Sequence, residues 1–122
     1  MSRSAKSILI FGIYMLVEGL LLFFIPNIFL EVVGIEPAQD VWIRAVGWAV
    51  FALGYYYIHA ARTNFKAFFG WTVHIRSLQF VVFIAFVALS LANPRVLIFS
   101  GIEFLAGLWT LWEIRREARI KN

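Results

Sequence analysis

The sequence contains no cysteine, and only 15% of its 122 residues are charged. Without a thiol, the chain cannot form disulfides, thiolate metal sites or thiol nucleophiles. Its charged fraction lies well below the roughly one-quarter that is usual for a soluble domain. Glycine-rich phosphate loops, His-Glu-x-x-His and Gly-x-Ser-x-Gly are also missing. These absences exclude the most familiar nucleotide-binding and hydrolase signatures.

Apolar residues, by contrast, are abundant and make up 62% of the chain. A soluble domain of this length leaves a large fraction of its surface in water, so it could not hide that much apolar area. Lipid accepts such a surface. The composition therefore predicts an integral membrane protein.

Four apolar segments are long enough to cross a bilayer, which takes about 20 residues per helix. The predicted spans are residues 7–25, 41–61, 67–92 and 96–112. Pro26 ends the first span because proline cannot continue the helical hydrogen-bond ladder. After it, residues 27–33 are typical of a short interfacial helix, and residues 113–122 form a basic helical tail. The predicted fold is all-α, a single domain over residues 1–122: a membrane four-helix bundle with antiparallel spans.

Basic residues are distributed unevenly around this bundle. Most of them fall on one side: Arg3, Lys6, Arg62, Lys66 and the tail. Because positive residues remain on the cytoplasmic side of a membrane, both termini are predicted to be cytoplasmic. The net charge of +4 does not indicate nucleic acid, since the sequence has no long basic run.

Two spans carry glycines at a helical repeat. Gly12 and Gly19 in the first span, and Gly47 and Gly54 in the second, are each seven residues apart, so each pair lies on one helical face. Small residues on a common face let helix backbones approach closely in lipid. We expect these faces to pack inside the bundle.

Ionisable side chains within the spans are the main candidates for function, because a charge inside a bilayer costs at least a few kcal/mol. Glu18 and Glu103 lie near the middle of spans one and four, and Arg76 and Gln79 share one face of span three. An arginine among carboxylates and an amide would satisfy most of their donors and acceptors. Two interpretations stay open: a charge cluster that sets the register of the bundle, or a polar pocket where a glutamate binds a proton or a ligand.

The second span also carries an aromatic and basic stripe at i+3 and i+4 steps: Arg44, Trp48, Phe51, Tyr55, His59 and Arg62. All six share one helical face. We expect this face to line the bundle interior and the neighbouring Tyr56 and Tyr57 to point elsewhere, toward lipid. Such a wall suits a flat or lipid-like ligand, and plain packing is the alternative.

Two histidines raise the question of a cofactor. His59 and His74 lie at similar depth on spans two and three, and paired histidines on neighbouring helices can ligate haem. However, His74 is two residues from Arg76, so the two side chains lie on nearly opposite faces. The Glu-x-x-His ligand pairs of di-iron bundles are missing. We therefore predict no metal and no cofactor, with haem or a quinone as the alternatives.

The first span contains Gly12, Glu18 and Gly19, and residues 26–30 read Pro-Asn-Ile-Phe-Leu. Residues 44–47 read Arg-Ala-Val-Gly and residues 52–55 read Ala-Leu-Gly-Tyr. In this order of features the chain resembles the DoxX-like group of small four-helix membrane proteins. The resemblance implies a bundle in the bacterial inner (cytoplasmic) membrane, and some relatives are membrane partners in quinone-linked or thiol-linked redox assemblies. Because this chain lacks cysteine, it cannot perform thiol chemistry itself.

The leading functional prediction is non-enzymatic. The protein binds a small apolar or quinone-like ligand, or a partner subunit, in an interior lined by Glu18, Tyr55, Arg76 and Glu103. One alternative is a redox subunit or enzyme acting on a lipid-soluble substrate, with Glu18 or Glu103 as general acid or base. Another is a proton-coupled transporter that works as an oligomer. The expected partners are the lipid bilayer and either a second copy of the chain or another membrane subunit.

Overall fold

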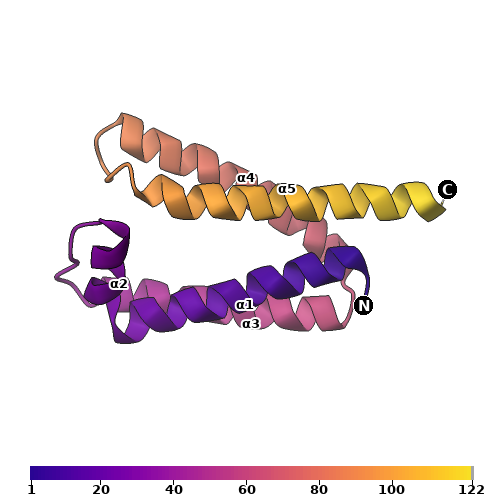
Figure 1. The fold of residues 1–122 in the computed structure, drawn as a ribbon, viewed down its shortest axis with the longest axis horizontal. Coiled ribbons are helices and arrows are strands. Elements are labelled where there is room, and N and C mark those ends of the chain that lie inside the picture. Colours follow the sequence, from indigo (N-terminus) through magenta and orange to yellow (C-terminus); the bar gives the residue numbers. More distant parts are fainter. Residues whose placement is uncertain (122) are drawn as a thin grey trace.

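All the regular structure of the chain is helical, as the composition and spacing predict. The computed structural model describes residues 1–121, and over these residues it contains five helices and no strand (Figure 1). The helices are α1 (Arg3–Phe24), α2 (Pro26–Val33), α3 (Trp42–Arg62), α4 (Lys66–Ala88) and α5 (Val96–Lys121). The predicted all-α class is confirmed.

Local sequence explains where the first two helices begin and end. The Ser2 hydroxyl accepts a hydrogen bond from the Ala5 amide at 3.2 Å, which caps the N-terminus of α1. Pro26 stands at the first position of α2, where its missing N–H costs nothing. Gly34 ends α2 with φ of 79°, a left-handed conformation that glycine adopts without strain. The predicted break at Pro26 and the short helix after it are confirmed.

The helix that corresponds to the third predicted span ends earlier than the sequence indicated. Instead of reaching residue 92, α4 ends at Ala88, and Ser90 has a positive φ of 60°. Proline disfavours a helical residue before it, and the turn ahead of Pro94 takes up this stretch. On the other side of Pro94, α5 runs without interruption through predicted span four and through the basic tail as far as Lys121.

The glycines of α1 and α3 bring these two helices into backbone contact. A Cβ added to Gly19 would lie 2.6 Å from the Gly47 carbonyl oxygen, and one added to Gly54 would lie 2.8 Å from the Gly12 carbonyl oxygen. Because Gly19 meets Gly47 and Gly12 meets Gly54, the two helices run in opposite directions (Figure 1). The expectation that these glycine faces pack is confirmed.

The other two long helices, α4 and α5, pack on each other, and α5 joins this pair to α1. Near the chain termini the two pairs share an apolar core. Its buried residues include Ile8 and Phe11 of α1, Tyr57 of α3 and Phe69 of α4. Toward the end that carries α2 the pairs diverge, as Figure 1 shows for α1 and α5. The firmly packed end of the molecule is therefore the end that carries both termini.

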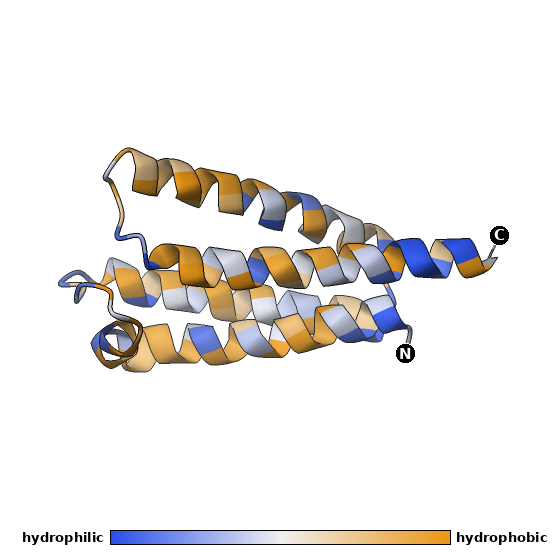
Figure 2. Cartoon of the chain, turned by 45° about the horizontal axis from the view of Figure 1, so that its top comes forward, coloured by the Kyte–Doolittle hydropathy of each residue, from blue (hydrophilic) through white to orange (hydrophobic). Residues whose placement is uncertain are grey.

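Three helices, α1, α4 and α5, are long and apolar enough to cross a membrane. Although α3 has 21 residues, it falls outside this set, and it contains Arg44, His59 and Arg62. Figure 2 shows the hydrophobic colour along most of the length of the long helices, with hydrophilic colour at the C-terminal end of α5. These helices place the chain in the class of membrane proteins.

The buried and exposed faces of α5 reverse the pattern of a soluble helix. Its buried residues are small or polar and include Ser100, Glu103, Thr110 and Glu113. Its exposed face carries large apolar side chains, among them Leu105, which is 65% exposed. A helix with this pattern is stable only where the surroundings are apolar, since lipid contacts the outer side chains and the interior polar groups must find partners there.

Candidate ligand-binding site

A cavity of about 420 Å³ lies where the two helix pairs diverge. Helices α1, α2 and α3 line one side of it, and α4 and α5 line the other. Most of the lining is apolar, including Met15, Leu22, Val46, Leu53, Phe83 and Phe99. The polar lining residues are Glu18, Glu36, Gln79 and Glu103. An apolar cavity with a few converging polar groups is the usual form of a small-molecule site.

Two predicted site residues meet at this cavity. The Gln79 Nε2 of α4 donates a hydrogen bond of 2.9 Å to the Glu103 Oε1 of α5. One residue further along each helix, the rings of Phe80 and Phe104 stack with centroids 4.9 Å apart. The ring pair holds the two helices in register, so the amide and the carboxyl stay opposite each other.

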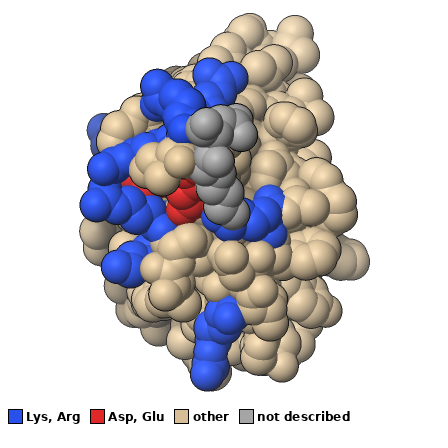
Figure 3. Space-filling view, turned by 90° about the vertical axis from the view of Figure 1, so that its right-hand side faces the viewer, with Lys and Arg blue, Asp and Glu red and all other residues tan. Residues whose placement is uncertain are grey.

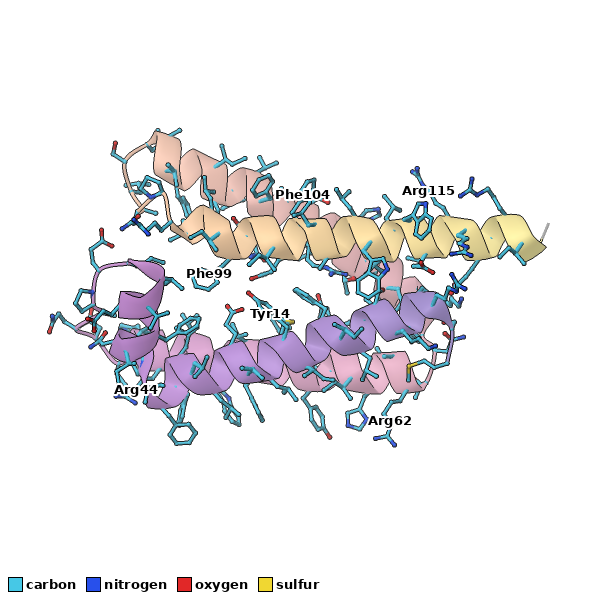
Figure 4. All side chains as sticks on the ribbon, in the orientation of Figure 1. Tyr14, Arg44, Arg62, Phe99, Phe104 and Arg115 are labelled. Carbon is cyan, nitrogen blue, oxygen red and sulfur yellow. The ribbon has the colours of Figure 1, made fainter. Side chains whose placement is uncertain are left out.

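Glu18 reaches the cavity from α1, and Tyr14, a residue that sequence reasoning missed, lies beside it without lining the cavity. Tyr14 lies one turn before Glu18, and its hydroxyl is the hydrogen-bonding neighbour of the Glu18 carboxyl. Both the Tyr14 hydroxyl and the Glu18 Oε2 are buried, and neither has another partner. Figure 4 shows Tyr14 on the side of α1 that faces α5. The sequence signal for Tyr14 was its position four residues before Glu18, because residues four apart share a helical face. Buried polar atoms without partners are costly unless something binds them.

The fourth member of the predicted cluster, Arg76, does not join the carboxylates. Its Nη2 donates to the Thr72 hydroxyl at 2.7 Å and to the Thr110 hydroxyl at 3.4 Å. Its guanidinium carbon lies 4.5 Å from the centroid of the Phe11 ring, a cation–π contact. Arg76 is only 2% exposed, does not line the cavity, and has no ion pair within the described part of the chain.

The structure therefore separates the predicted cluster into two parts. Side chains on a helix lean toward its N-terminus, and this carries the Arg76 guanidinium toward Thr72 rather than toward the cavity. Thr110 extends the second part to α1 through a 2.8 Å hydrogen bond with Ser7. Arg76 thus connects α4 and α5 near the packed end, whereas Glu18, Gln79 and Glu103 form the polar wall of the cavity.

The expectation that the aromatic and basic stripe of α3 faces the interior is wrong. Trp48 is 61% exposed and Tyr55 is 55% exposed. Arg44, His59 and Arg62 are also exposed, and Figure 4 shows Arg44 and Arg62 pointing away from the bundle. A different face of α3, with Gly47, Gly54 and the buried Tyr57, turns inward instead. The glycine face turns inward because it alone allows backbone contact with α1. The expectation that Tyr57 points toward lipid is therefore also wrong.

The histidines are both exposed. His59 lies beside Tyr55 with ring centroids 4.4 Å apart, and His74 lies on the outer side of α4. Neither histidine lines the cavity. Within residues 1–121, no three His, Cys, Asp or Glu side chains are placed so that they could hold a metal ion.

Lys and Arg side chains gather at the end of the molecule that carries the termini (Figure 3). One acid lies among them, since Glu117 forms an ion pair with Lys66 and accepts hydrogen bonds from the Ser4 amide and hydroxyl at 2.9 and 2.8 Å. Burial favours the protonated form, but the bonds from Lys66 and Ser4 outweigh it and lower the pKa of Glu117 to about 2. This contact ties the basic tail of α5 to α1 and α4.

Comparisons with protein-family models, with curated proteins and with solved structures each find no match to this chain. The geometry of the cavity is therefore the basis for inferring function.

Proposed function

We propose that the protein crosses the membrane four times, with α3 as the fourth span and with antiparallel neighbours. The support comes from the packing of α3 against α1. Gly19 and Gly47 bring the backbones together at one level and Gly12 and Gly54 at another. A helix of similar length in backbone contact with a membrane span along two turns occupies the same depth of the bilayer.

We infer that both termini lie in the cytoplasm and that the membrane is the bacterial inner membrane. The concentration of Lys and Arg at the end of the molecule that carries the termini supports this orientation. The bacterial location is the one implied by the resemblance to the DoxX-like group, which is itself a proposal.

We propose that the protein binds a small, mostly apolar ligand in the cavity between the helix pairs. The observation that carries this proposal is the 420 Å³ cavity, whose apolar walls end in Glu18, Gln79 and Glu103. The ligand's body would lie against the apolar side chains and its polar group against these three residues. Val46 and Leu53 of α3 line the cavity and are also exposed, so a ligand dissolved in lipid can enter from the side.

A cavity-filling variant tests this function. Val46→Phe places extra atoms in the cavity, whereas Ala49→Phe adds the same ring on a residue of α3 that is exposed and does not line it. Binding of decanol is measured by native mass spectrometry on protein released from a mild detergent. The wild type and Ala49→Phe are expected to carry the ligand, and Val46→Phe is expected to lose about tenfold in occupancy. Equal occupancy in all three proteins would show that the cavity is not the site.

A further inference from the structure

The cavity contains acidic groups and no basic group. Its titratable lining residues are Glu18, Glu36 and Glu103, and no Lys, Arg or His is among the described residues that line it. Glu36 already accepts a 3.1 Å hydrogen bond from Asn93. The acidic character of the interior therefore rests on Glu18 and Glu103.

The nearest arginines are directed elsewhere. Arg76 binds Thr72, Thr110 and the Phe11 ring, and its Nη1 is buried without a hydrogen-bond partner. Arg44 donates to the Phe23 carbonyl oxygen on the outer side of the α1–α3 pair. Glu18 and Glu103 consequently have no ion-pair partner within the described part of the chain. Carboxylates inside a bilayer usually pair with a cation.

We propose that the ligand of this cavity is a lipophilic cation, an amine or quaternary ammonium group attached to an apolar body. This inference rests on the proposed function, since it names the chemical class that the cavity would accept. The cationic group would lie between Glu18 and Glu103, whose carboxyls both line the cavity and form no ion pair within residues 1–121. The apolar body would extend along the walls toward α2.

Aromatic rings in the lining fit the same ligand. Phe29 of α2 and Phe99 of α5 have ring centroids 5.5 Å apart, and Phe83 of α4 also contributes to the wall. The faces of aromatic rings attract cations, and quaternary ammonium ligands are commonly bound in this way.

A quinone fits less well than a cation. Its carbonyl oxygens accept hydrogen bonds, so it needs donors at the polar wall. The Gln79 amide already donates to Glu103, and the Tyr14 hydroxyl lies beside the Glu18 carboxyl. Ionised carboxylates would face the quinone oxygens with the same sign of charge.

Protons compete with the ligand for the same carboxylates. The titratable and charged groups around Glu103 are Tyr14 and Glu18 of α1, Tyr57 of α3 and Arg76 of α4. A cation and a proton cannot occupy one carboxylate together. We therefore expect binding of a permanent cation to weaken as the pH is lowered.

The test compares ligands that share a decyl chain and differ in the head group. The full-length protein is placed in phosphatidylcholine nanodiscs, and calorimetric titrations are corrected with empty nanodiscs. Decyltrimethylammonium is expected to bind at least about tenfold more tightly than decanol, decanoate or decylubiquinone. Similar affinities for the ammonium ion and decanol, or tighter binding of decanoate or the quinone, would overturn the cation assignment.

Two variants and a control locate the charge effect. Glu18→Gln and Glu103→Gln are each expected to weaken ammonium binding by about ten- to hundredfold while leaving decanol binding unchanged. Glu31→Gln, at an exposed acid of α2, is expected to change neither. If decanol binds and depends on Val46 but the ammonium ion has no advantage, only the cation assignment fails. If Val46→Phe reduces the binding of none of the decyl compounds, the proposed function fails together with the cation assignment.

Discussion

At the scale of single residues, glycines let the backbones of α1 and α3 come into contact. Gly19 and Gly47 let the α1 and α3 backbones meet, and a Cβ at either position would fall within 3 Å of backbone atoms of the other helix. Backbone cannot move aside as a flexible side chain can. The α1–α3 contact thus depends on the absence of two methyl groups.

We expect Gly19→Ala to lower the stability of the protein by about 1–3 kcal/mol, because overpacking forces the two backbones apart. The measurement is thermal unfolding in a mild detergent. Gly70→Ala is the matched control, since nothing lies within 4 Å of a Cβ added there and alanine favours a helix by up to about 1 kcal/mol. Equal destabilisation by both changes would show that helix packing at Gly19 is not responsible.

At the scale of helices, one acid in the tail of α5 bonds to two other helices. Glu117 receives bonds from Lys66 of α4 and Ser4 of α1, and these bonds lower its pKa in the folded protein. A lowered pKa means that the folded state favours the ionised form. The contact therefore stabilises the fold above the ordinary glutamate pKa of about 4.3.

We expect this stabilisation to disappear as the pH falls from about 5 toward 2, where Glu117 becomes protonated. Unfolding temperatures are compared between wild type and Glu117→Gln across this range. The difference is expected to be largest above pH 5 and to close at the acid end. Glu31→Gln should follow the wild-type curve, and parallel curves for wild type and Glu117→Gln would contradict the assignment.

At the scale of the whole molecule, the number of spans determines which loops share a side. If α3 crosses the membrane, the loop before it and the turn after it lie on opposite sides. If it does not, Gln39 and Thr63 lie on the same side. Because the chain has no cysteine, a single introduced cysteine gives one unambiguous labelling site.

We expect Gln39→Cys to react with a membrane-impermeant maleimide added to intact spheroplasts. Thr63→Cys is expected to react only after the membrane is permeabilised, since it lies at the basic, cytoplasmic end. Both residues are exposed, so failure to react cannot come from burial in the protein. Labelling of both cysteines from outside would rule out the four-span arrangement, and the reverse pattern would invert the orientation.

The parts of the fold that depend on neighbouring residues were predictable from the sequence. The break at Pro26 and the caps of the first helices follow from side-chain and backbone chemistry within a few positions. The glycine repeats on α1 and α3 also marked the contact face correctly, because a seven-residue spacing depends only on helix geometry. The sequence also placed Gln79 and Glu103 in one polar cluster, but it centred that cluster on Arg76, which binds elsewhere.

The rest depended on how the helices rotate and approach one another. Periodicity shows that α3 has two distinct faces, but only packing against α1 turns Gly47 inward and leaves Trp48 and Tyr55 outside. In the same way, the sequence offered Arg76 both carboxyl and hydroxyl partners. The direction of its side chain in the folded protein brings it to Thr72 and Thr110. The sequence by itself determined the helices and their contact-forming small residues, through local geometry. Only the tertiary structure decided that the cavity is lined by acids and by no Lys, Arg or His among the described residues, because this depends on which polar partners Arg76 reaches.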